Sequence, residues 1–448
     1  MRESARNDKA RRHRLNYSEA VVRVQRLLLA GRGEDTIAFF LDVRGGFDHA
    51  LMRQAVALLY ARHDSLRLTF TRRGFSLRQY FAAERSPGPI EEIRFEDAAS
   101  EADFALRLSM RPMSLFKGQT LRVFFVTRPD GTESILCQVS HYAADLYGAG
   151  VLASDLFAVY DALAAGGPLP PAPGSYEEVV RMDNRYDADR ERRRRDRVFY
   201  RDYVSRLQRP LYCGIDKDAE KRRSPYYLSL DPLHQEALSQ AFDLPAATLE
   251  KLEAYGQESG FSLSLILYCA CALASSLQRG KARHLAAMQL VDCRGSVRER
   301  KAAGTKVQAL ASFIEMDYGK SFADNLTMLG EDMNELYRHP YFPFMRVNLD
   351  LHRRWFFPLL GYAYSFIFSY VPQSMPEHVS FRLVESGRST MLSYVVLRHD
   401  LVHKQLSLRL IVRKKLAGKA QLEAFRDCFV HVLDRVLAAP GQPLDQIL

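Results

Sequence analysis

The chain has 448 residues, more than one hydrophobic core usually supports, so we expect two domains. Its composition, with 47% hydrophobic and 26% charged residues, is that of a globular protein and excludes extensive disorder. The formal net charge of +10 favours an anionic partner, such as nucleic acid, membrane headgroups or an acidic carrier protein.

The cysteine pattern and the N-terminus bear on location. The six cysteines are scattered and none forms a CxxC pair with a matching partner motif, which argues against a structural metal site and a disulfide scaffold. The basic N-terminus lacks the apolar core of a signal peptide. The longest uncharged run, residues 355–376, is interrupted by Pro358 and Gly361 and favours a buried strand over a membrane span. We therefore predict a cytoplasmic protein without a metal ion.

The first third of the chain predicts alternating strands and helices. Residues 1–14 predict a disordered basic tail and residues 35–43 a strand. Asp48 is a candidate N-cap for the helix that follows. Residues 61–70 return to strand character, and a Pro-Asp-Gly turn at residues 129–131 predicts a hairpin.

The second strand of this hairpin, residues 135–139, leads to the main chemical motif. It ends at His141, and Asp145 follows before a helix predicted over residues 151–165. A strand that brings a histidine to a loop can place a general base at a sheet edge. The alternative is an ordinary surface loop between a strand and a helix.

A glycine- and proline-rich segment, residues 166–174, predicts a linker and a lobe boundary. We therefore expect an N-terminal lobe at residues 15–173 and a C-terminal lobe at residues 174–448. The basic helix at residues 190–197 is interpreted as the solvated face of an amphipathic helix, because no nucleic-acid-binding module accompanies it.

The second half repeats the alternation of strands and helices. A buried helix is predicted at residues 261–277, a strand at residues 285–291 and an amphipathic helix at the C-terminus. Further strands are predicted at residues 307–316, 366–371, 392–397 and 406–412. The fold class is therefore α/β or α+β, with two lobes.

The order of these motifs resembles the condensation-domain family of nonribosomal peptide synthetases, within the chloramphenicol-acetyltransferase-like superfamily of acyltransferases. The likeness covers the chain from about Leu15 to Leu448. It rests on a set of motifs in family order: Arg62–Arg67, Ser140–Asp145, Asp155–Leu156, Tyr160, Tyr176, Phe199–Tyr200, Val291–Arg294 and Phe368–Tyr370.

This resemblance implies two α+β sandwich lobes of chloramphenicol-acetyltransferase type in a V-shaped pseudo-dimer, with a tunnel at their junction. It implies that His141 positions or deprotonates an amine or hydroxyl that attacks an acyl thioester, and that Asp145 is structural and pairs with Arg294. Ser140 and Ser369 become possible tunnel or substrate-binding residues. The donor would be a phosphopantetheine thioester of a carrier protein or of coenzyme A, with no covalently bound cofactor.

Two positions depart from the family pattern. Ser140 replaces the first histidine of His-His-x-x-x-Asp-Gly, and Leu146 replaces its glycine. Glycine permits backbone conformations that leucine resists, so Leu146 is the change that bears most on catalysis.

Two hypotheses follow. In the first, the chain is a free-standing, monomeric acyltransferase of natural-product biosynthesis that forms an amide or ester, with His141 as base. In the second, it is a degenerate, non-catalytic relative that recruits a carrier protein or tailoring enzyme through Arg192, Arg193, Arg194 and Arg195. A coenzyme A-dependent enzyme outside peptide assembly is a third possibility.

Overall fold

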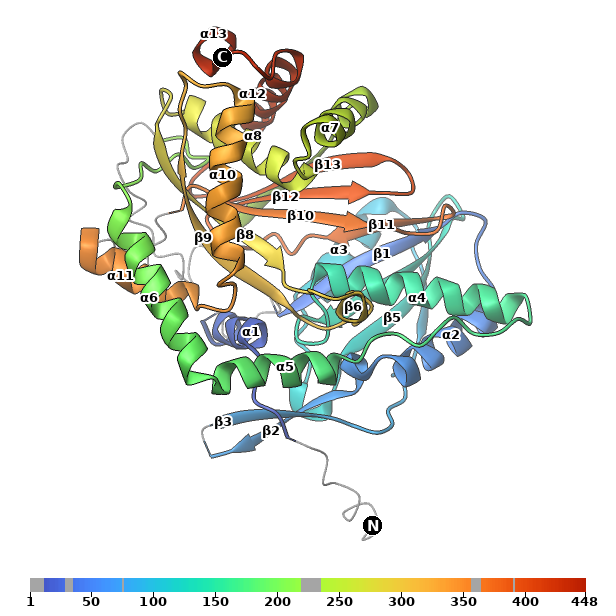
Figure 1. The fold of residues 1–448 in the computed structure, drawn as a ribbon. Helices are drawn as coiled ribbons and strands as arrows, with labels where there is room; N and C mark the ends of the chain where they lie inside the picture. The colour runs from blue at the N-terminus through green and yellow to red at the C-terminus, as the bar shows by residue number, and fades with distance from the viewer. Residues whose placement is uncertain (1–11, 29–34, 75, 219–234, 356–363, 390) are drawn as a thin grey trace. The chain divides into compact units, whose positions relative to one another are not determined.

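A computed structural model describes residues 12–28, 35–74, 76–218, 235–355, 364–389 and 391–448 (Figure 1). Residues 1–11 of the predicted basic tail, and residues 356–363 of the long uncharged run, lie outside the described residues. Residues 12–14 differ from the predicted tail. His13 is buried because its main chain pairs with Gln79 and its ring binds Glu177.

Contacts divide the chain into two compact units. Unit 1 comprises residues 1–190, 292–307 and 373–386, and unit 2 comprises residues 191–291, 308–372 and 387–448. The boundary predicted at residues 173 and 174 is therefore displaced. The helix after the linker packs into unit 1, where Tyr176, Val179 and Val180 form a buried cluster with Ala302. The two later segments of unit 1 also fall inside the predicted C-terminal lobe.

Unit 1 contains a mixed set of helices and strands. Its helices are α1 (Tyr17–Leu28), α2 (His49–Arg62), α3 (Ala98–Ser109), α4 (Leu146–Ala164), α5 (Tyr176–Ala188) and α9 (Val297–Arg300). Its strands are β1 (Thr36–Val43), β2 (Leu68–Arg73), β3 (Ser76–Phe81), β4 (Glu91–Arg94), β5 (Leu121–Thr127), β6 (Glu133–Ser140) and β11 (Val379–Val384).

Five of these strands form one sheet in the order β11-β1-β6-β5-β4. β6 is central and pairs antiparallel with β1 on one side and with β5 on the other, so the predicted hairpin is confirmed. Strand alternation sends side chains to both faces. Phe39 and Leu41 pack with α2 and α4, whereas Phe40 packs with α3. Figure 1 shows α2 and α4 side by side along this sheet.

Helix α4 is the main apolar helix of unit 1. Among the described residues, α4 is long and apolar enough to cross a membrane. The pair α7 and α8, bent by 113°, would also be long enough if it formed one span. Ala149, Leu152 and Leu156 of α4 lie in the core of unit 1. Packing against the sheet therefore accounts for the apolarity of α4.

Unit 2 holds a second sheet. Its strands are β7 (Ala237–Asp243), β8 (His284–Asp292), β9 (Val307–Glu315), β10 (Ile367–Gln373), β12 (Ser393–Asp400) and β13 (Gln405–Arg413). They lie in the order β7-β13-β12-β10-β8-β9. Its helices are α6 (Arg190–Arg206), α7 (Ala246–Ser259), α8 (Leu263–Leu277), α10 (Phe322–Tyr337), α11 (Phe344–Trp355), α12 (Lys419–Ala438) and α13 (Leu444–Ile447).

The predicted mixed helix and strand class is confirmed, and the predicted elements are found with small shifts at their ends. Asp48 caps α2 as expected, because its carboxylate accepts the Leu51 N–H at 2.8 Å. Two elements differ. Asp64–Arg67 forms a 3-10 turn rather than the start of a strand. Helix α4 begins at Leu146, five residues before the predicted start, because Asp145 is its N-cap.

Candidate active site

Strand β6 brings the histidine motif to the end of the unit 1 sheet. Ser140 is the last residue of the strand and its N–H donates to the Thr120 carbonyl at 2.8 Å. The Ser140 carbonyl then accepts the N–H groups of Ala143 and Ala144, which closes the turn that carries His141. Ser140 is 1% exposed, so the structure places this predicted substrate-binding residue inside the turn.

His141 is held through its main chain. Its N–H donates to the Asp35 carbonyl at 2.7 Å, and its carbonyl accepts the Thr305 hydroxyl. The side chain is half-buried, and Nδ1 has no hydrogen-bond partner among the described residues. A buried polar atom without a partner costs about 1–3 kcal/mol, and one explanation of such an atom is a catalytic role.

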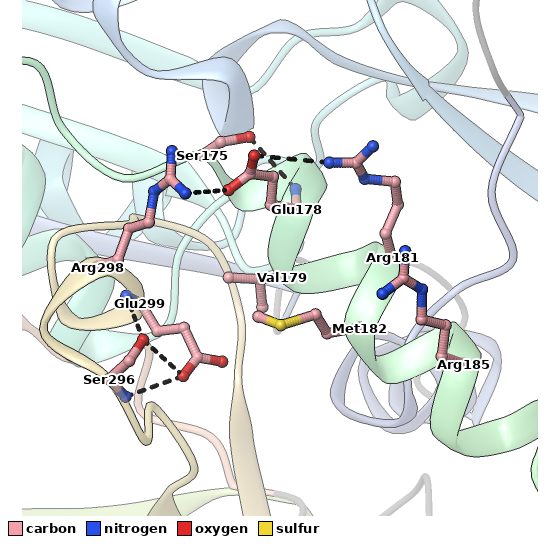
Figure 2. Close-up of a pocket in the computed structure, with 9 residues that line it drawn as sticks. All are labelled: Ser175, Glu178, Val179, Arg181, Met182, Arg185, Ser296, Arg298 and Glu299. Carbon is pink, nitrogen blue, oxygen red and sulfur yellow. Dashed lines mark hydrogen bonds and ion pairs between the residues drawn. The ribbon is translucent and has the colours of Figure 1, made fainter.

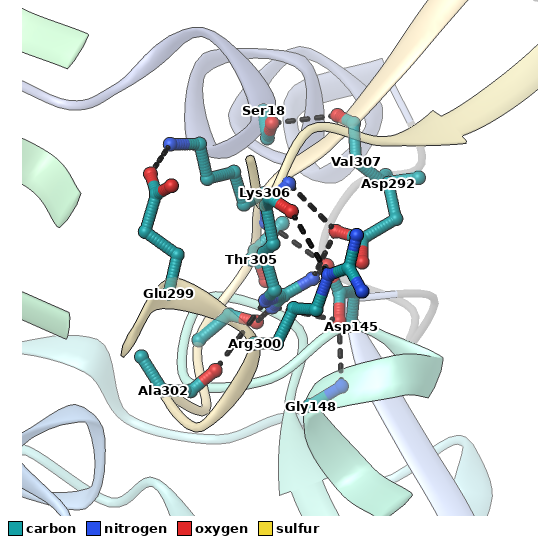
Figure 3. A network of polar contacts seen from close by, with 12 residues as sticks. Ser18, Asp145, Gly148, Asp292, Glu299, Arg300, Ala302, Thr305, Lys306 and Val307 are labelled. Carbon is teal, nitrogen blue, oxygen red and sulfur yellow. Dashed lines mark hydrogen bonds and ion pairs between the residues drawn. The ribbon is translucent and has the colours of Figure 1, made fainter. Parts of the chain in front are cut away.

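Asp145 joins the start of α4 to residues 292–307. Its Oδ1 accepts the Gly148 N–H at 2.7 Å, and its Oδ2 accepts the Lys306 N–H at 2.9 Å. Its own N–H donates to the Gly304 carbonyl at 3.1 Å. Figure 3 shows these contacts around the carboxylate. The structure thus gives Asp145 the position of a structural residue that links two segments of unit 1.

Arg294 binds this carboxylate in a bidentate manner. Nη1 donates to Oδ2 and Nη2 to Oδ1 of Asp145, each at 3.1 Å. Nη1 also donates to Asp292 at 2.8 Å, and Nη2 to the Gly304 carbonyl at 2.7 Å. Burial alone would lower the pKa of Arg294, but Asp145 and Asp292 raise it above its ordinary value. The guanidinium therefore stays charged in a site that is 3% exposed.

Leu146 does not sit in a strained conformation. It is the first residue of α4, and the non-glycine residues with positive φ in the described chain are Lys281 and Lys404. The close approach instead falls on Gly148, where a Cβ would lie 2.8 Å from the Gly304 carbonyl oxygen. The concern that leucine resists the backbone conformation needed at position 146 is therefore wrong for this chain.

Several residues of this network escaped sequence reasoning. Lys306 is buried and its Nζ binds Glu299 and lies 3.5 Å from Asp183. Asp292 binds Arg294, and Thr305 holds His141. The sequence signal that could have indicated them is the pair Thr305 and Lys306 directly after Gly304, in a segment without strand alternation.

The Arg62–Arg67 motif anchors α4 and α5. Arg62 binds Asp155 through two hydrogen bonds of 2.8 Å, and His63 Nε2 lies 3.0 Å from the same carboxylate. Asp64 accepts the first two N–H groups of α5, from Tyr176 at 2.8 Å and from Glu177 at 3.0 Å. Burial would raise the pKa of Asp155, but His63 and Arg62 lower it to about 2.

The remaining predicted site residues belong to unit 2. Ser369 lies in β10 in register with Leu290 of β8 and is 6% exposed. Arg192–Arg195 lie on α6 and are exposed, whereas Asp196 and Tyr200 of the same helix are buried. The amphipathic interpretation of this helix agrees with that pattern.

Unit 1 also contains a surface pocket of about 320 Å³, shown in Figure 2. It lies beside α5 and α9 and is lined by Ser175, Glu178, Val179, Arg181, Met182, Arg185, Ser296, Arg298 and Glu299. Glu178 lies 3.6 Å from Arg181 and 3.5 Å from Arg298, so the acid offsets part of the positive charge. Neither His141 nor Asp145 lines this pocket.

The described part of the chain contains no cluster of metal-binding side chains. No group of three or more histidine, cysteine, aspartate or glutamate residues there could hold a metal ion. All six cysteines are free thiols.

The chain belongs to the condensation-domain family. The family model described as "Condensation domain" matches residues 36–448. The resemblance expected from the sequence is confirmed.

Curated relatives are large synthetases. A linear gramicidin synthase protein of Brevibacillus parabrevis is 23% identical over 423 residues, which cover 90% of this chain and 5% of that protein. Phosphinothricin tripeptide synthetase PhsC of Streptomyces viridochromogenes is 30% identical over 141 residues, 30% of this chain and 13% of that protein. The chain thus spans a small part of the length of these relatives.

Solved structures show the same fold at low identity. A mutant starter condensation domain of rhizomide synthetase RzmA, in complex with C8-CoA, has a TM-score of 0.81, with 17% identity and 100% coverage of both chains. The first condensation domain of the calcium-dependent antibiotic synthetase, with a substrate analogue, has a TM-score of 0.77, with 19% identity and 98% coverage of both chains.

Proposed function

We propose that this chain is a catalytically competent condensation-type acyltransferase. It transfers an acyl or peptidyl group from a phosphopantetheine thioester to an amine or hydroxyl acceptor and forms an amide or an ester. His141 is the base or positioning residue, and Asp145 and Arg294 hold the turn that carries it. The single observation that carries the proposal is the bidentate Asp145–Arg294 pair directly behind the His141 turn.

The pair supports catalysis because it leaves the aspartate unable to act as the base. Both carboxylate oxygens accept two N–H groups each, from Arg294 and from the main chain of Gly148 or Lys306. A carboxylate so engaged fixes geometry rather than moving protons. His141 is then the nearby side chain of the type that most often acts as a general base.

In the proposed reaction, His141 takes up a proton from the acceptor and later releases it to the leaving group. Because Nδ1 is buried, we assign the proton transfer to Nε2. Nε2 accepts the proton of the acceptor N–H or O–H as the acceptor atom bonds to the thioester carbon. The C–S bond then breaks, and the departing phosphopantetheine thiolate takes up the proton.

The donor is proposed by analogy. The neighbouring rhizomide synthetase structure contains C8-CoA, and the curated relatives are peptide synthetases. A carrier protein or coenzyme A, both anionic, would suit a chain with a net charge of +10.

The proposal is tested with His141→Ala. We expect product formation to fall by about 10²–10⁴-fold while the melting curve is unchanged. Intact-mass spectrometry of acyl carriers incubated with each variant measures transfer directly. Undiminished transfer by His141→Ala would exclude the role of His141 as a base. Ser140→Ala serves as a matched neighbour, because Ser140 is 1% exposed and its hydroxyl accepts the Tyr142 N–H at 3.4 Å within the turn.

The second candidate is a non-catalytic carrier-binding module, favoured by the exposed arginines of α6. It predicts retention of a phosphopantetheinylated carrier in a pull-down with no acyl transfer by the parent protein. The helical conformation of Leu146 removes the backbone argument for this alternative.

A further inference from the structure

Glu19, near the start of α1, is a fully buried acid outside the motifs discussed so far. Its exposed fraction is 0%, and no cationic side chain of the described residues forms an ion pair with it. Its Oε2 accepts the Asn16 N–H at 2.7 Å and the Gln79 amide at 2.6 Å. An ionised carboxylate buried without a cation is costly, so the environment favours the neutral acid.

The hydrogen bonds around Tyr176 also favour a protonated Glu19. The Tyr176 hydroxyl lies 2.9 Å from Glu19 Oε1 and 3.1 Å from the Thr305 carbonyl oxygen, and it accepts the Asn16 amide at 3.1 Å. A tyrosine hydroxyl has one proton and can donate to one of these oxygens at a time. A protonated Glu19 donates to Tyr176, and Tyr176 then donates to Thr305, so every close pair of oxygens shares a proton.

This chain of donors ends at the histidine turn. Thr305, whose carbonyl Tyr176 reaches, donates its hydroxyl to the His141 carbonyl. The next residue, Lys306, donates its N–H to Asp145. Ser18 of α1 also binds this segment, because its hydroxyl donates to the Val307 carbonyl at 2.6 Å (Figure 3). Residues 305–307 therefore connect α1 to both His141 and Asp145.

We propose that Glu19 is a positioning residue that acts in its protonated form, holding Thr305 through Tyr176 and thereby fixing the backbone of His141. Burial raises the pKa of Glu19 to about 8, against the lowering effect of its hydrogen bonds. Above that pH Glu19 ionises and Tyr176 turns its proton towards the carboxylate. The Thr305 carbonyl then loses its hydroxyl donor and keeps the Asn16 amide, which lies 3.1 Å away.

The other titratable groups near Glu19 do not oppose the rise in its pKa. Asp183 of α5 adds a further raising effect on Glu19, and burial raises the pKa of Asp183 itself to about 6. The pKa of Tyr176 lies well above its ordinary value, so it stays neutral throughout. The facing group from β3 is the neutral amide of Gln79, and Lys306 is engaged by Glu299 and Asp183.

The first measurement follows His141 directly by nuclear magnetic resonance of ¹³C-labelled histidine, between pH 6.5 and 9.5. The His141 signal is assigned by its absence in His141→Gln. We expect the parent to show an inflection near pH 8 that Glu19→Gln lacks, because glutamine mimics the protonated acid. Tyr176→Phe should also abolish it. Glu423→Gln, which removes an ion-paired carboxylate from α12, should keep it.

The second measurement is the pH dependence of the melting temperature. The ordinary pKa of the group is 4.5 and the folded value about 8, so the folded state holds one extra proton between them. The parent therefore loses stability as pH rises through this interval, relative to Glu19→Gln. Identical pH profiles for both proteins would overturn the proposal.

The outcomes separate this inference from the proposed function on which its purpose rests. A stability difference without any change at His141 would reduce Glu19 to a fold-stabilising residue and overturn the positioning role. An inflection at His141 in a protein that transfers no acyl group would leave the positioning role in place and refute the acyltransferase. If both hold, acyl transfer by the parent should fall above pH 8 and that by Glu19→Gln should not.

Discussion

Arg294 holds Asp145 through two hydrogen bonds of 3.1 Å, one from each terminal guanidinium nitrogen to a different carboxylate oxygen. The two residues are separated by 149 positions. The same carboxylate caps α4 through Gly148 and binds the main chain of Lys306. One side chain therefore fixes the start of a helix and the path of residues 304–306 together.

Removing the buried carboxylate of Asp145 should lower the stability of the folded protein. Asp145→Ala leaves a buried guanidinium with Asp292 as its remaining carboxylate and uncaps α4. We expect a loss of about 3 kcal/mol or more in the free energy of unfolding. Chemical denaturation measures it. Equal midpoints for parent and variant would argue against the structural role of the pair.

Two glycines of α4 provide a matched test of the close approach to Gly304. A Cβ at position 148 would lie 2.8 Å from the Gly304 carbonyl oxygen, whereas one at position 150 would meet the Gln373 side chain at 3.4 Å. We expect Gly148→Ala to cost about 1–3 kcal/mol of unfolding free energy because backbone must move.

Gly150→Ala is the control for that comparison. It should be neutral or stabilising by up to about 1 kcal/mol, because alanine favours helix over glycine. Thermal melts of both variants decide the point. A stable Gly148→Ala protein with parental activity would contradict the packing argument.

Restoring the family glycine at position 146 should not increase acyl transfer. Leu146 is helical and packs against the core of unit 1. Leu146→Gly should therefore lower the free energy of unfolding by about 1–2 kcal/mol and leave acyl transfer at or below the parental rate. A marked gain in transfer would show that leucine limits catalysis after all.

Asp155 predicts an acid-dependent contribution to stability. Its pKa falls from 3.8 to about 2, so the paired form contributes at most about 2 kcal/mol above pH 4, because solvent screens part of the interaction. Because the folded pKa is the lower one, this contribution is lost as pH falls from 3.8 towards 2. Asp155→Asn should be less stable than the parent at pH 7, and the difference should shrink at about pH 2–3. A difference independent of pH would exclude the ionic mechanism.

The arginines of α6 predict salt-sensitive binding of an acidic carrier. Replacing Arg192, Arg193, Arg194 and Arg195 with glutamate should weaken binding and reduce its dependence on salt. Surface plasmon resonance at about 50 and about 300 mM salt compares the two proteins. Carrier binding that is unaffected by the four substitutions would place the docking surface elsewhere.

The sequence by itself determined the elements whose cause is local. Alternation predicted β6, the N-cap predicted α2, and the order of short motifs predicted the condensation family and the roles proposed for His141, Asp145 and Arg294. Even Leu146 could be identified as the substitution to examine. The strand and the cap depend on neighbours within a few positions, so a single chain reveals them, whereas the roles of His141, Asp145 and Arg294 followed from the resemblance to the family.

Tertiary structure decided which distant segments meet. Residues 292–307 follow a strand of unit 2 but pack in unit 1, because Arg294, Gly304 and Lys306 satisfy the buried groups around Asp145. Glu19 reaches the same site through Tyr176, 157 positions away. Burial and hydrogen-bond partners at such separations surround Glu19, and no local pattern encodes them.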